Sequence, residues 1–268
     1  MARKARLDAE LVRRGLARSR EHAAELIAAG VVRVAGQPAA KPATGVDAGT
    51  PVTVIEADTG PHYASRGGHK LAGALEAFAP GGLTVSGRRC LDAGASTGGF
   101  TDVLLRAGAE HVVAVDVGYG QLAWQLRTDE RVTVVDRTNV RTLTPDAIGG
   151  RASLTVADLS FISLKLVLPA LAACTDPDGD LVPMVKPQFE VGRERLGSGG
   201  VVRDPALRAE AVLAVAAEAA TMDLGVAGVV ASPLPGPSGN VEFFLWLRRG
   251  APPADEEEVR RVVEEATG

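Results

Sequence analysis

The stretch RCLDAGASTGGFTDVLLRAGAEHVVAVD, residues 89–116, sets the fold that the rest of the chain must fit. The apolar run Cys90–Ala93 predicts a strand, the glycines of 94–99 predict a turn, and the apolar positions of 103–107 predict one stripe of a helix. A second apolar run then ends on Asp116. Strand, loop, helix and strand form one unit of an open, mostly parallel sheet. Such sheets bind ligands beyond the carboxyl ends of their strands.

Length and composition limit the classes of protein that this chain can represent. Its 268 residues leave room for one large domain and a small one, and 46% hydrophobic residues with 4% aromatics predict an aliphatic core. No apolar run is long enough to span a bilayer, and no signal-peptide pattern follows the basic N-terminus. We therefore expect a cytoplasmic protein without a membrane partner. Cys90, Cys174 and the four histidines match no metal-ligand spacing, so we expect buried thiols and no metal.

Charge is distributed unevenly along the chain. Residues 1–20 hold seven basic and two acidic side chains, a net charge of +5, while the remainder carries −9. A basic arm on an acidic protein indicates a polyanion bound at one end. Arg18 and Arg20 open a predicted helix, where the helix dipole disfavours cations, and phosphate is the candidate that would select them. A solvated basic face without a ligand is the alternative.

Strands and helices alternate along the rest of the chain, which predicts an α/β sheet with helices on both faces. Predicted helices are 8–16, 19–29, 66–78, 121–126, 163–173, 206–222 and 255–266. Predicted strands outside the opening stretch are 31–34, 52–55, 132–135, 154–157, 181–185, 226–231 and 242–247.

Polar residues at the carboxyl ends of the predicted strands are the candidate site. They are Asp92, Asp116, Asp136, Asp158 and Lys186. Each alone could be an ordinary strand-end or capping residue, but together they predict one crevice with acids for a sugar and an amine, plus a lysine. The chain uses few lysines, which marks Lys70 and Lys186 as candidates for a role that arginine cannot fill. The absence of Gly-x-Gly-x-x-Gly and of a P-loop motif argues against a dinucleotide pyrophosphate and against kinase chemistry.

Two parts of the sequence resemble known domains. The form D-x-G-x-x-x-G-G at 92–99 resembles the S-adenosylmethionine (SAM) loop of class I methyltransferases, and residues 7–42 resemble the S4 RNA-binding domain. Five ordered segments are similar to the TlyA family of SAM-dependent ribosomal RNA 2′-O-methyltransferases: SRGGHKL at 65–71, DAGASTGGFTDVLL at 92–105, ADLSFISL at 157–164, VKPQFE at 185–190 and SGNVEFFLWL at 238–247.

The resemblance implies a domain plan and a substrate. It implies a small α+β S4 domain over 1–56, a linker over 57–65 and a Rossmann-like class I methyltransferase domain over 66–268. The start MARKARLDAEL resembles the type that methylates cytidines in both ribosomal subunits. The cofactor implied is SAM, and the partner is ribosomal RNA or a ribosomal subunit.

The resemblance also assigns roles to individual residues. The Lys-Asp-Lys-Glu catalytic tetrad of FtsJ-like enzymes falls on Lys70, Asp158, Lys186 and Glu242. Implied SAM contacts are Asp92, Gly94, Ser96, Gly98, Gly99, Phe100, Asp116, Asp136 and Phe161, with Asp116 on the ribose, Asp136 on the adenine edge and Phe161 in apolar contact. Expected RNA contacts are Arg3, Lys4, Arg6, Arg18, Arg20 and Arg66.

The tetrad residues suit the transfer of a methyl group to a ribose hydroxyl, which is a poor nucleophile. Lys186 can accept the hydroxyl proton only after losing its own, and a neighbouring Lys70 ammonium would favour that loss or would stabilise the developing oxyanion. Asp158 would hold the lysines and orient the hydroxyl, and Glu242 would orient one of the lysines. Methyl transfer is an in-line displacement, so positioning contributes most of the rate.

Two other classes of function stay open at this point. One is a membrane-active haemolysin, a name often given to this family, although the sequence has no spanning segment and no strongly basic amphipathic helix beyond the S4-like region. The other is a non-catalytic RNA-binding protein on a degenerate methyltransferase fold, although the glycine loop and all four tetrad positions are intact.

Overall fold

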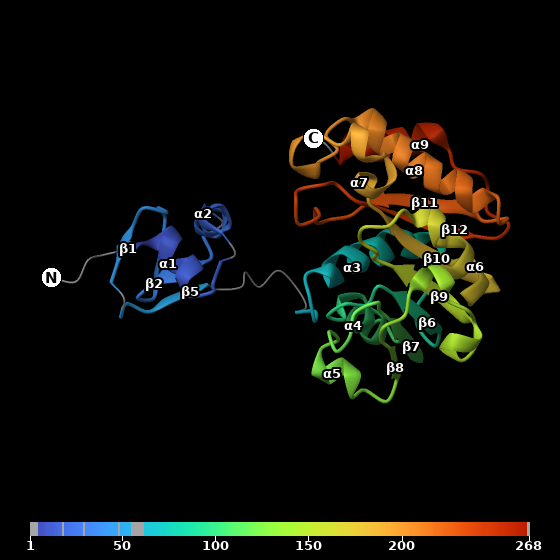
Figure 1. Cartoon of the computed structure of the whole chain (residues 1–268), viewed down its shortest axis with the longest axis horizontal. Helices are drawn as coiled ribbons and strands as arrows, with labels where there is room; N and C mark the ends of the chain where they lie inside the picture. The colour runs from blue at the N-terminus through green and yellow to red at the C-terminus, as the bar shows by residue number, and fades with distance from the viewer. Residues whose placement is uncertain (1–4, 18, 29, 48, 55–61, 267–268) are drawn as a thin grey trace. The chain divides into compact units, whose positions relative to one another are not determined.

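The chain folds into two compact units, Met1–Pro61 and His62–Gly268. Figure 1 shows the computed structural model, which describes residues 5–17, 19–28, 30–47, 49–54 and 62–266. The expected contacts Arg3, Lys4 and Arg18 lie outside the described residues, as does most of the predicted linker. Residues 62–65, which we expected in the linker, belong to the second unit. Ala64 N donates to Asp102 Oδ2 there (2.8 Å).

The first unit packs two helices, α1 (Leu7–Arg13) and α2 (Arg20–Ala28), against short strands. An antiparallel three-stranded sheet runs in the order β3 (Gln37–Pro38), β2 (Val32–Val34), β5 (Val52–Val54), and β1 (Ala5–Arg6) pairs with β4 (Gly45–Val46). Its core is aliphatic and comprises Leu7, Leu11, Ala17, Ala23, Ile27, Val32, Ala39, Val46 and Val52. The two helices and the strands 31–34 and 52–55 predicted from the sequence are therefore confirmed.

The second unit is built on a seven-stranded sheet. Its order is β11 (Gly225–Ala231), β12 (Phe243–Arg248), β10 (Thr175–Val185), β9 (Ala152–Ala157), β6 (Arg89–Ala93), β7 (His111–Val115), β8 (Val132–Val135). β12 alone runs against its neighbours, since it is antiparallel to both β10 and β11 while the other pairs are parallel. The mostly parallel α/β class is confirmed.

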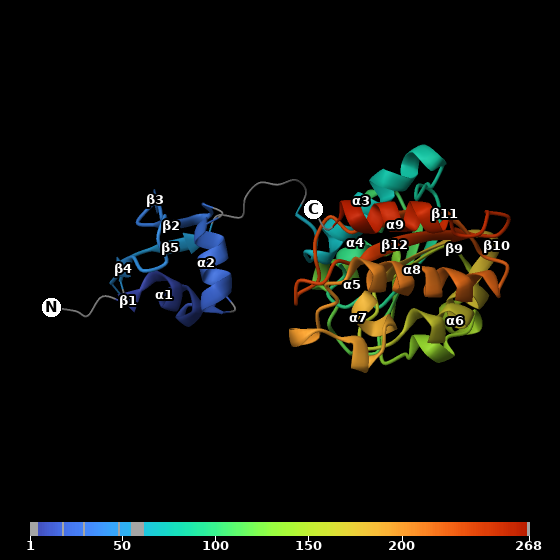
Figure 2. The same ribbon diagram turned by 90° about the horizontal axis from the view of Figure 1, so that it is seen from above.

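Helices cover both faces of this sheet, as Figure 2 shows from a second direction. Alternate strand residues point to opposite faces. Leu91 and Val113 belong to the core with α6 (Leu168–Cys174), α8 (Pro205–Ala220) and α9 (Glu256–Glu265). Cys90 and Val112 belong to the core with α3 (Gly67–Phe78), α4 (Gly99–Arg106) and α5 (Trp124–Arg127). Because the strand residues on both faces of the sheet are apolar, both faces are buried under helices.

The reversed strand has a consequence for the site. β12 begins where β10 ends, and Phe243 pairs with Val185. Glu242, which precedes β12, therefore lies at the same edge of the sheet as Lys186, which follows β10. The sequence places these residues 56 positions apart, and only the antiparallel pairing brings them to one edge.

Two predicted helices differ from the observed ones. The helix expected over 121–126 is replaced by the shorter α5, which begins at Trp124 and ends at Arg127, while Ser96 Oγ donates to Gln121 Oε1 (3.4 Å). The helix expected over 163–173 is a 3₁₀ turn, Leu164–Leu166, followed by α6, which begins with Pro169 in its first turn. Proline is favoured at that position because its missing N–H has no partner within the helix. None of the helices in the described ranges is long and apolar enough to cross a bilayer.

Candidate active site

Two adjoining pockets lie at the carboxyl edge of the parallel strands. The first, which we call the lysine pocket, has a volume of about 310 Å³ and contains Lys70, Asp158 and Lys186. The second, the Asp116 pocket, has a volume of about 450 Å³. Gly94, Ser96, Asp158 and Ser160 line both pockets. A molecule in one pocket would therefore meet a molecule in the other beside the glycine loop and Asp158.

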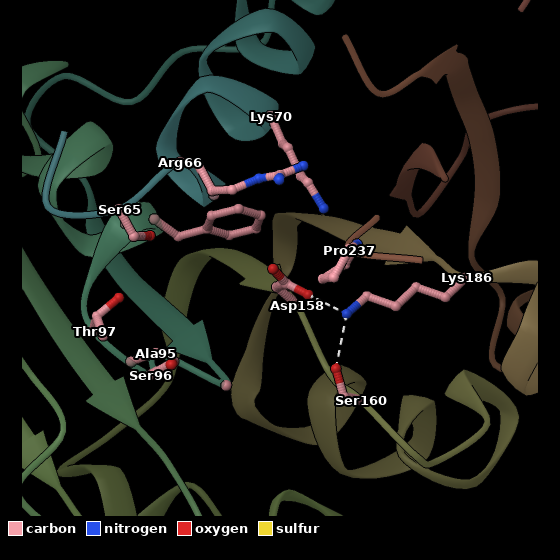
Figure 3. A pocket seen from close by; sticks show the side chains of 14 residues that line it. Ser65, Arg66, Lys70, Ala95, Ser96, Thr97, Asp158, Ser160, Lys186 and Pro237 are labelled. Carbon is pink, nitrogen blue, oxygen red and sulfur yellow. Dashed lines mark hydrogen bonds and ion pairs between the residues drawn. The ribbon is translucent and has the colours of Figure 1, made fainter. Parts of the chain in front are cut away.

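The four residues of the expected tetrad form two ion pairs. Lys186 Nζ lies 2.6 Å from Asp158 Oδ1, and Lys70 Nζ lies 2.5 Å from Glu242 Oε2. In Figure 3 the two lysines point into the lysine pocket from different elements, Lys70 from α3 and Lys186 from the end of β10. We expected Asp158 to hold both lysines, and the direct pairing assigns one acid to each.

Burial differs between these two pairs. The Lys70 and Glu242 side chains are 6% and 1% exposed, while Asp158 is 25% exposed beside a nearly buried Lys186. Lys70 lies on the buried stripe of α3, three residues after that helix begins. Pro187 begins α7 (Pro187–Glu190) and leaves Lys186 extended, with φ −112° and ψ 99°. This conformation agrees with the constraint that a proline places on the residue before it.

The Asp116 carboxylate is oriented by backbone amides. Ser96 N donates to Oδ2 (2.8 Å) and Gly118 N donates to Oδ1 (2.6 Å). Each carboxylate oxygen has a second lone pair, so the group can still accept bonds from hydroxyl donors. Apolar side chains, among them Val117, Val140 and Ile162, line the same pocket.

The loop glycines are required mainly by contacts within the chain. Gly94 has φ +89° and Gly98 has φ +97°, which disfavour any other residue. A Cβ on Gly94 would lie 2.4 Å from the Asp158 carbonyl oxygen, and one on Gly99 would lie 2.2 Å from Ser65 Oγ. We expected the glycines to let a ligand approach the backbone. In this structure the absence of a Cβ also lets neighbouring segments of the chain pack against the loop. Gly94, Ser96, Gly99 and Phe100 line the pockets.

Asp92 lies beneath the loop in the middle of the sheet. It is fully buried, accepts a bond from Thr101 Oγ1 (2.6 Å), and has no partner for Oδ1 among the described residues. Burial raises the pKa of Asp92 to about 7, against an ordinary value of 3.8. It lines neither of the two pockets, and its expected contact with the cofactor stays a prediction.

Asp136 also lies outside the Asp116 pocket. Its Oδ2 accepts bonds from Arg127 (2.9 Å) and from Gly120 N (3.2 Å), and the Arg127 guanidinium lowers the pKa of Asp136. The pocket wall after β8 is formed instead by Thr138, Asn139 and Val140. Asp136 and Asp116 therefore do not line the same pocket.

Phe161 projects from the loop that follows β9. The residue is 92% exposed, it lines the Asp116 pocket, and its φ of +65° is unusual for a bulky residue. Glu190 holds the far end of this loop by accepting bonds from Ser163 Oγ (2.5 Å) and Leu164 N (2.7 Å). Burial raises the pKa of the Glu190 carboxyl group.

The described arginines of the basic arm are already paired. Arg6 and Arg20 each lie 2.9 Å from Asp8, which is buried, and these bonds hold the pKa of Asp8 well below its usual range. We expected phosphate to account for a cation at the start of α2, and Asp8 gives a reason within the chain. The arginine side chains remain 52% and 60% exposed, so other N–H groups still face solvent. Arg66 lines the lysine pocket and donates to the Pro235 carbonyl (2.6 Å).

Several residues of the pockets were not among the site residues expected from the sequence. Ser160 bonds to Lys186 Nζ (3.0 Å), and Ser65 and Pro237 line the lysine pocket. Ser160 could have been suspected from its place two residues after Asp158. Pro237 reaches the pocket from a distant loop that no spacing rule connects to it.

Comparison with known proteins gives the same architecture. The S4 domain matches residues 5–52, and the FtsJ-like methyltransferase model matches residues 63–249. A relative from Mycobacterium tuberculosis, named 16S/23S rRNA (cytidine-2′-O)-methyltransferase TlyA, is 67% identical over 92% of this chain and 91% of its own. Hemolysin A of Brachyspira hyodysenteriae is 36% identical over 89% of this chain and 98% of its own.

A solved structure supports the fold over the whole length. The protein described as "Putative hemolysin from Streptococcus thermophilus" has a TM-score of 0.79 at 40% identity, covering 99% of this chain and 96% of that one. Proteins named as methyltransferases and as haemolysins thus share this sequence pattern and these two domains. The chain belongs to the TlyA family of FtsJ-like methyltransferases with an N-terminal S4 domain.

Proposed function

We propose that this protein transfers a methyl group from SAM to the 2′ oxygen of a cytidine ribose in ribosomal RNA. The observation that carries the proposal is the lysine pocket. There, two lysines and an acid from separate elements meet beside a second pocket whose carboxylate suits a ribose.

Each residue of the lysine pocket has a role in this reaction. Lys186 faces the attacking 2′ hydroxyl, where it takes the proton or stabilises the developing negative charge. Asp158 fixes Lys186 through the 2.6 Å ion pair. Glu242 fixes Lys70, whose ammonium adds positive charge to the pocket. Positioning the hydroxyl in line with the methyl donor contributes most of the rate.

The Asp116 pocket suits SAM, which supplies an activated methyl group on a sulfonium. Asp116 would accept bonds from the ribose hydroxyls, because its oxygens are already aimed by two backbone amides. The apolar wall at Val117, Val140 and Ile162 would take the adenine, with Asn139 available for its polar edge. Asp92 would act on the cofactor only through the loop above it.

The substrate follows from the family and from the first unit. The M. tuberculosis relative is named for cytidine methylation in both 16S and 23S ribosomal RNA, and we extend that activity to this chain. The S4 unit, with its exposed arginines, would supply the affinity for RNA. In this proposal the S4 domain covers 1–56, the linker 57–65 and the methyltransferase 66–268, with linker residues 62–65 already packed in the second unit.

A mapping experiment tests the proposal. Purified protein, SAM, and ribosomal RNA or subunits from a strain lacking this enzyme are incubated, and 2′-O-methyl groups are mapped along both RNAs. We expect new methylation on cytidine riboses that is absent when SAM is omitted. Methylation of a base, or methylation only of RNA other than ribosomal RNA, would contradict the proposal. Leakage of lipid vesicles at the same protein concentration would instead support a haemolysin.

A further inference from the structure

The Lys186 ammonium has a second partner besides its tetrad acid. Its Nζ donates to Ser160 Oγ (3.0 Å) while it pairs with Asp158 Oδ1 (2.6 Å), and Figure 3 shows both contacts. Both acceptors come from the loop that follows β9. An ammonium has three N–H donors. Two of these N–H groups point at the two acceptors. The tetrahedral geometry of the nitrogen then fixes the direction of the third.

We propose that Ser160 is a positioning residue for methyl transfer, which it assists by holding the Lys186 nitrogen toward the substrate oxygen. This inference rests on the proposed function. One contact to Asp158 would leave the ammonium able to rotate about a single axis. A second contact to Ser160 fixes that rotation, so the remaining N–H position faces the pocket that both residues line.

Two acceptors suit the lysine in both protonation states. A neutral amine keeps two N–H donors and one lone pair, so it can still donate to Asp158 and to Ser160. Its lone pair then takes the remaining tetrahedral position, where it can accept the proton of the substrate hydroxyl. The Ser160 hydroxyl also adds no negative charge beside Lys186, whereas a second carboxylate would.

The loop keeps the hydroxyl in place although Ser160 is exposed. At one end Asp158 N donates to the Ala93 carbonyl of the neighbouring strand (3.0 Å). At the other end Ser163 and Leu164 are bound to Glu190. Ser160 lies between these two anchors and lines both pockets, at the place where methyl donor and acceptor must meet.

The charges around Lys186 come from several elements. Asp158 follows β9, Lys70 and Arg66 belong to the start of α3, Glu242 precedes β12 and pairs with Lys70, and Glu190 on α7 binds the loop beyond Ser160. The Phe189 ring lies 6.0 Å from Nζ. Replacing Ser160 by alanine changes none of these charges, so the effect of the hydroxyl can be measured separately.

The test is a set of single-turnover rates at saturating RNA and SAM. Ser160→Ala should lower the rate about tenfold and leave the dissociation constant for SAM within about twofold of wild type, because the variant loses orientation and not a cofactor contact. Ser160→Thr keeps the hydroxyl at an exposed position and should recover most of the rate. Ser163→Ala, which loosens the same loop without touching Lys186, should keep the pH dependence of the wild type.

The pH profile separates positioning from general loosening of the loop. A bond from an ammonium is stronger than one to a neutral amine, so alanine at 160 should move the rate midpoint to lower pH by about 0.5 unit. A wild-type rate and midpoint in Ser160→Ala would overturn the inference, as would an alanine defect that threonine does not repair. The wild-type rate in the same assay reports on the proposed function itself, so the two ideas fail separately.

Discussion

The ion pairs of the first unit differ from the two tetrad pairs of the second unit in the burial of the basic side chain. In the first unit Asp8 and Glu10 are buried, but their arginines remain between 20% and 62% exposed. In the tetrad the basic side chains are buried, with Lys70 at 6% and Lys186 at 9%. An exposed guanidinium keeps N–H groups for another anion. A buried ammonium can donate its remaining N–H only to a group that enters its pocket.

Two further carboxylates extend the comparison. Asp116 is satisfied by backbone amides, and Asp92, whose Oδ1 has no partner among the described residues, accepts a bond from the Thr101 hydroxyl. Neither has a cation partner in the described part of the chain. The carboxylates therefore range from groups paired with an exposed cation to a buried group without a cation partner. Each environment predicts a different result when the acid or its partner is removed.

The largest effect is expected at Lys186. Lys186→Ala should reduce methyl transfer by about 10³-fold or more, because the group that handles the hydroxyl proton or its charge is lost. SAM affinity, measured by titration calorimetry, should change little. Lys186→Arg is the matched control, and it should be nearly as inactive if proton transfer matters, since a guanidinium stays protonated. An alanine variant with wild-type turnover would remove Lys186 from the mechanism.

Removing the acid of the most buried pair should destabilise the protein. Glu242→Gln leaves the Lys70 ammonium buried without its counter-ion, which should cost about 3–5 kcal/mol of unfolding free energy in urea titrations. The double variant Lys70→Met with Glu242→Gln removes both charges and should regain most of that loss while staying inactive. If Glu242→Gln is as stable as wild type, the Lys70 ammonium does not need the Glu242 charge to remain buried in the folded protein.

Asp92 should give a pH-dependent stability. Its pKa is raised to about 7, so between pH 4 and 7 the folded state binds more protons than the unfolded state, and stability falls as pH rises. From about pH 5 to pH 8 the wild type should lose roughly 2–3 kcal/mol relative to Asp92→Asn. Urea titrations of both proteins across this range measure the difference. A constant difference would show that Asp92 is already ionised at the lower pH.

Asp116 should affect cofactor binding and little else. Asp116→Ala should weaken SAM binding by about 1–3 kcal/mol, because ribose hydroxyls lose their acceptor. Asp116→Asn keeps an acceptor oxygen and should lose less. Titration calorimetry measures both, and unchanged affinity in the alanine variant would indicate that the ribose is held elsewhere.

The smallest effect is expected in the first unit. Arg20→Ala should lower unfolding free energy by less than about 1 kcal/mol, since the arginine is largely exposed. If the same guanidinium binds a phosphate, the log–log salt dependence of RNA affinity should flatten by about 1. Arg13→Ala breaks a comparable pair with Glu10 and is the control for stability alone. Equal salt slopes in wild type and Arg20→Ala would make Arg20 a structural partner of Asp8 only.

Local pattern was enough for most of the elements and for their order. Apolar runs and glycines between 89 and 116 predicted β6, the loop, α4 and β7, since period and turn chemistry depend on neighbouring residues. The positions of Asp116, Asp158 and Lys186 at strand ends followed from the same argument. Lysine scarcity marked Lys70, and the family resemblance added Glu242 and joined both to the other two tetrad residues, which no local pattern would have done.

Tertiary structure decided which side chains meet. Lys70 pairs with Glu242 across 172 positions because β12 runs backward beside β10, and Arg20 meets Asp8 because α1 and α2 pack together. The same sheet buries Asp92 and directs Asp136 toward Arg127, although both looked like Asp116 in the sequence. A strand end fixes the edge at which a residue lies. Its partner depends on elements that arrive from elsewhere in the chain, and that information is absent from the local sequence.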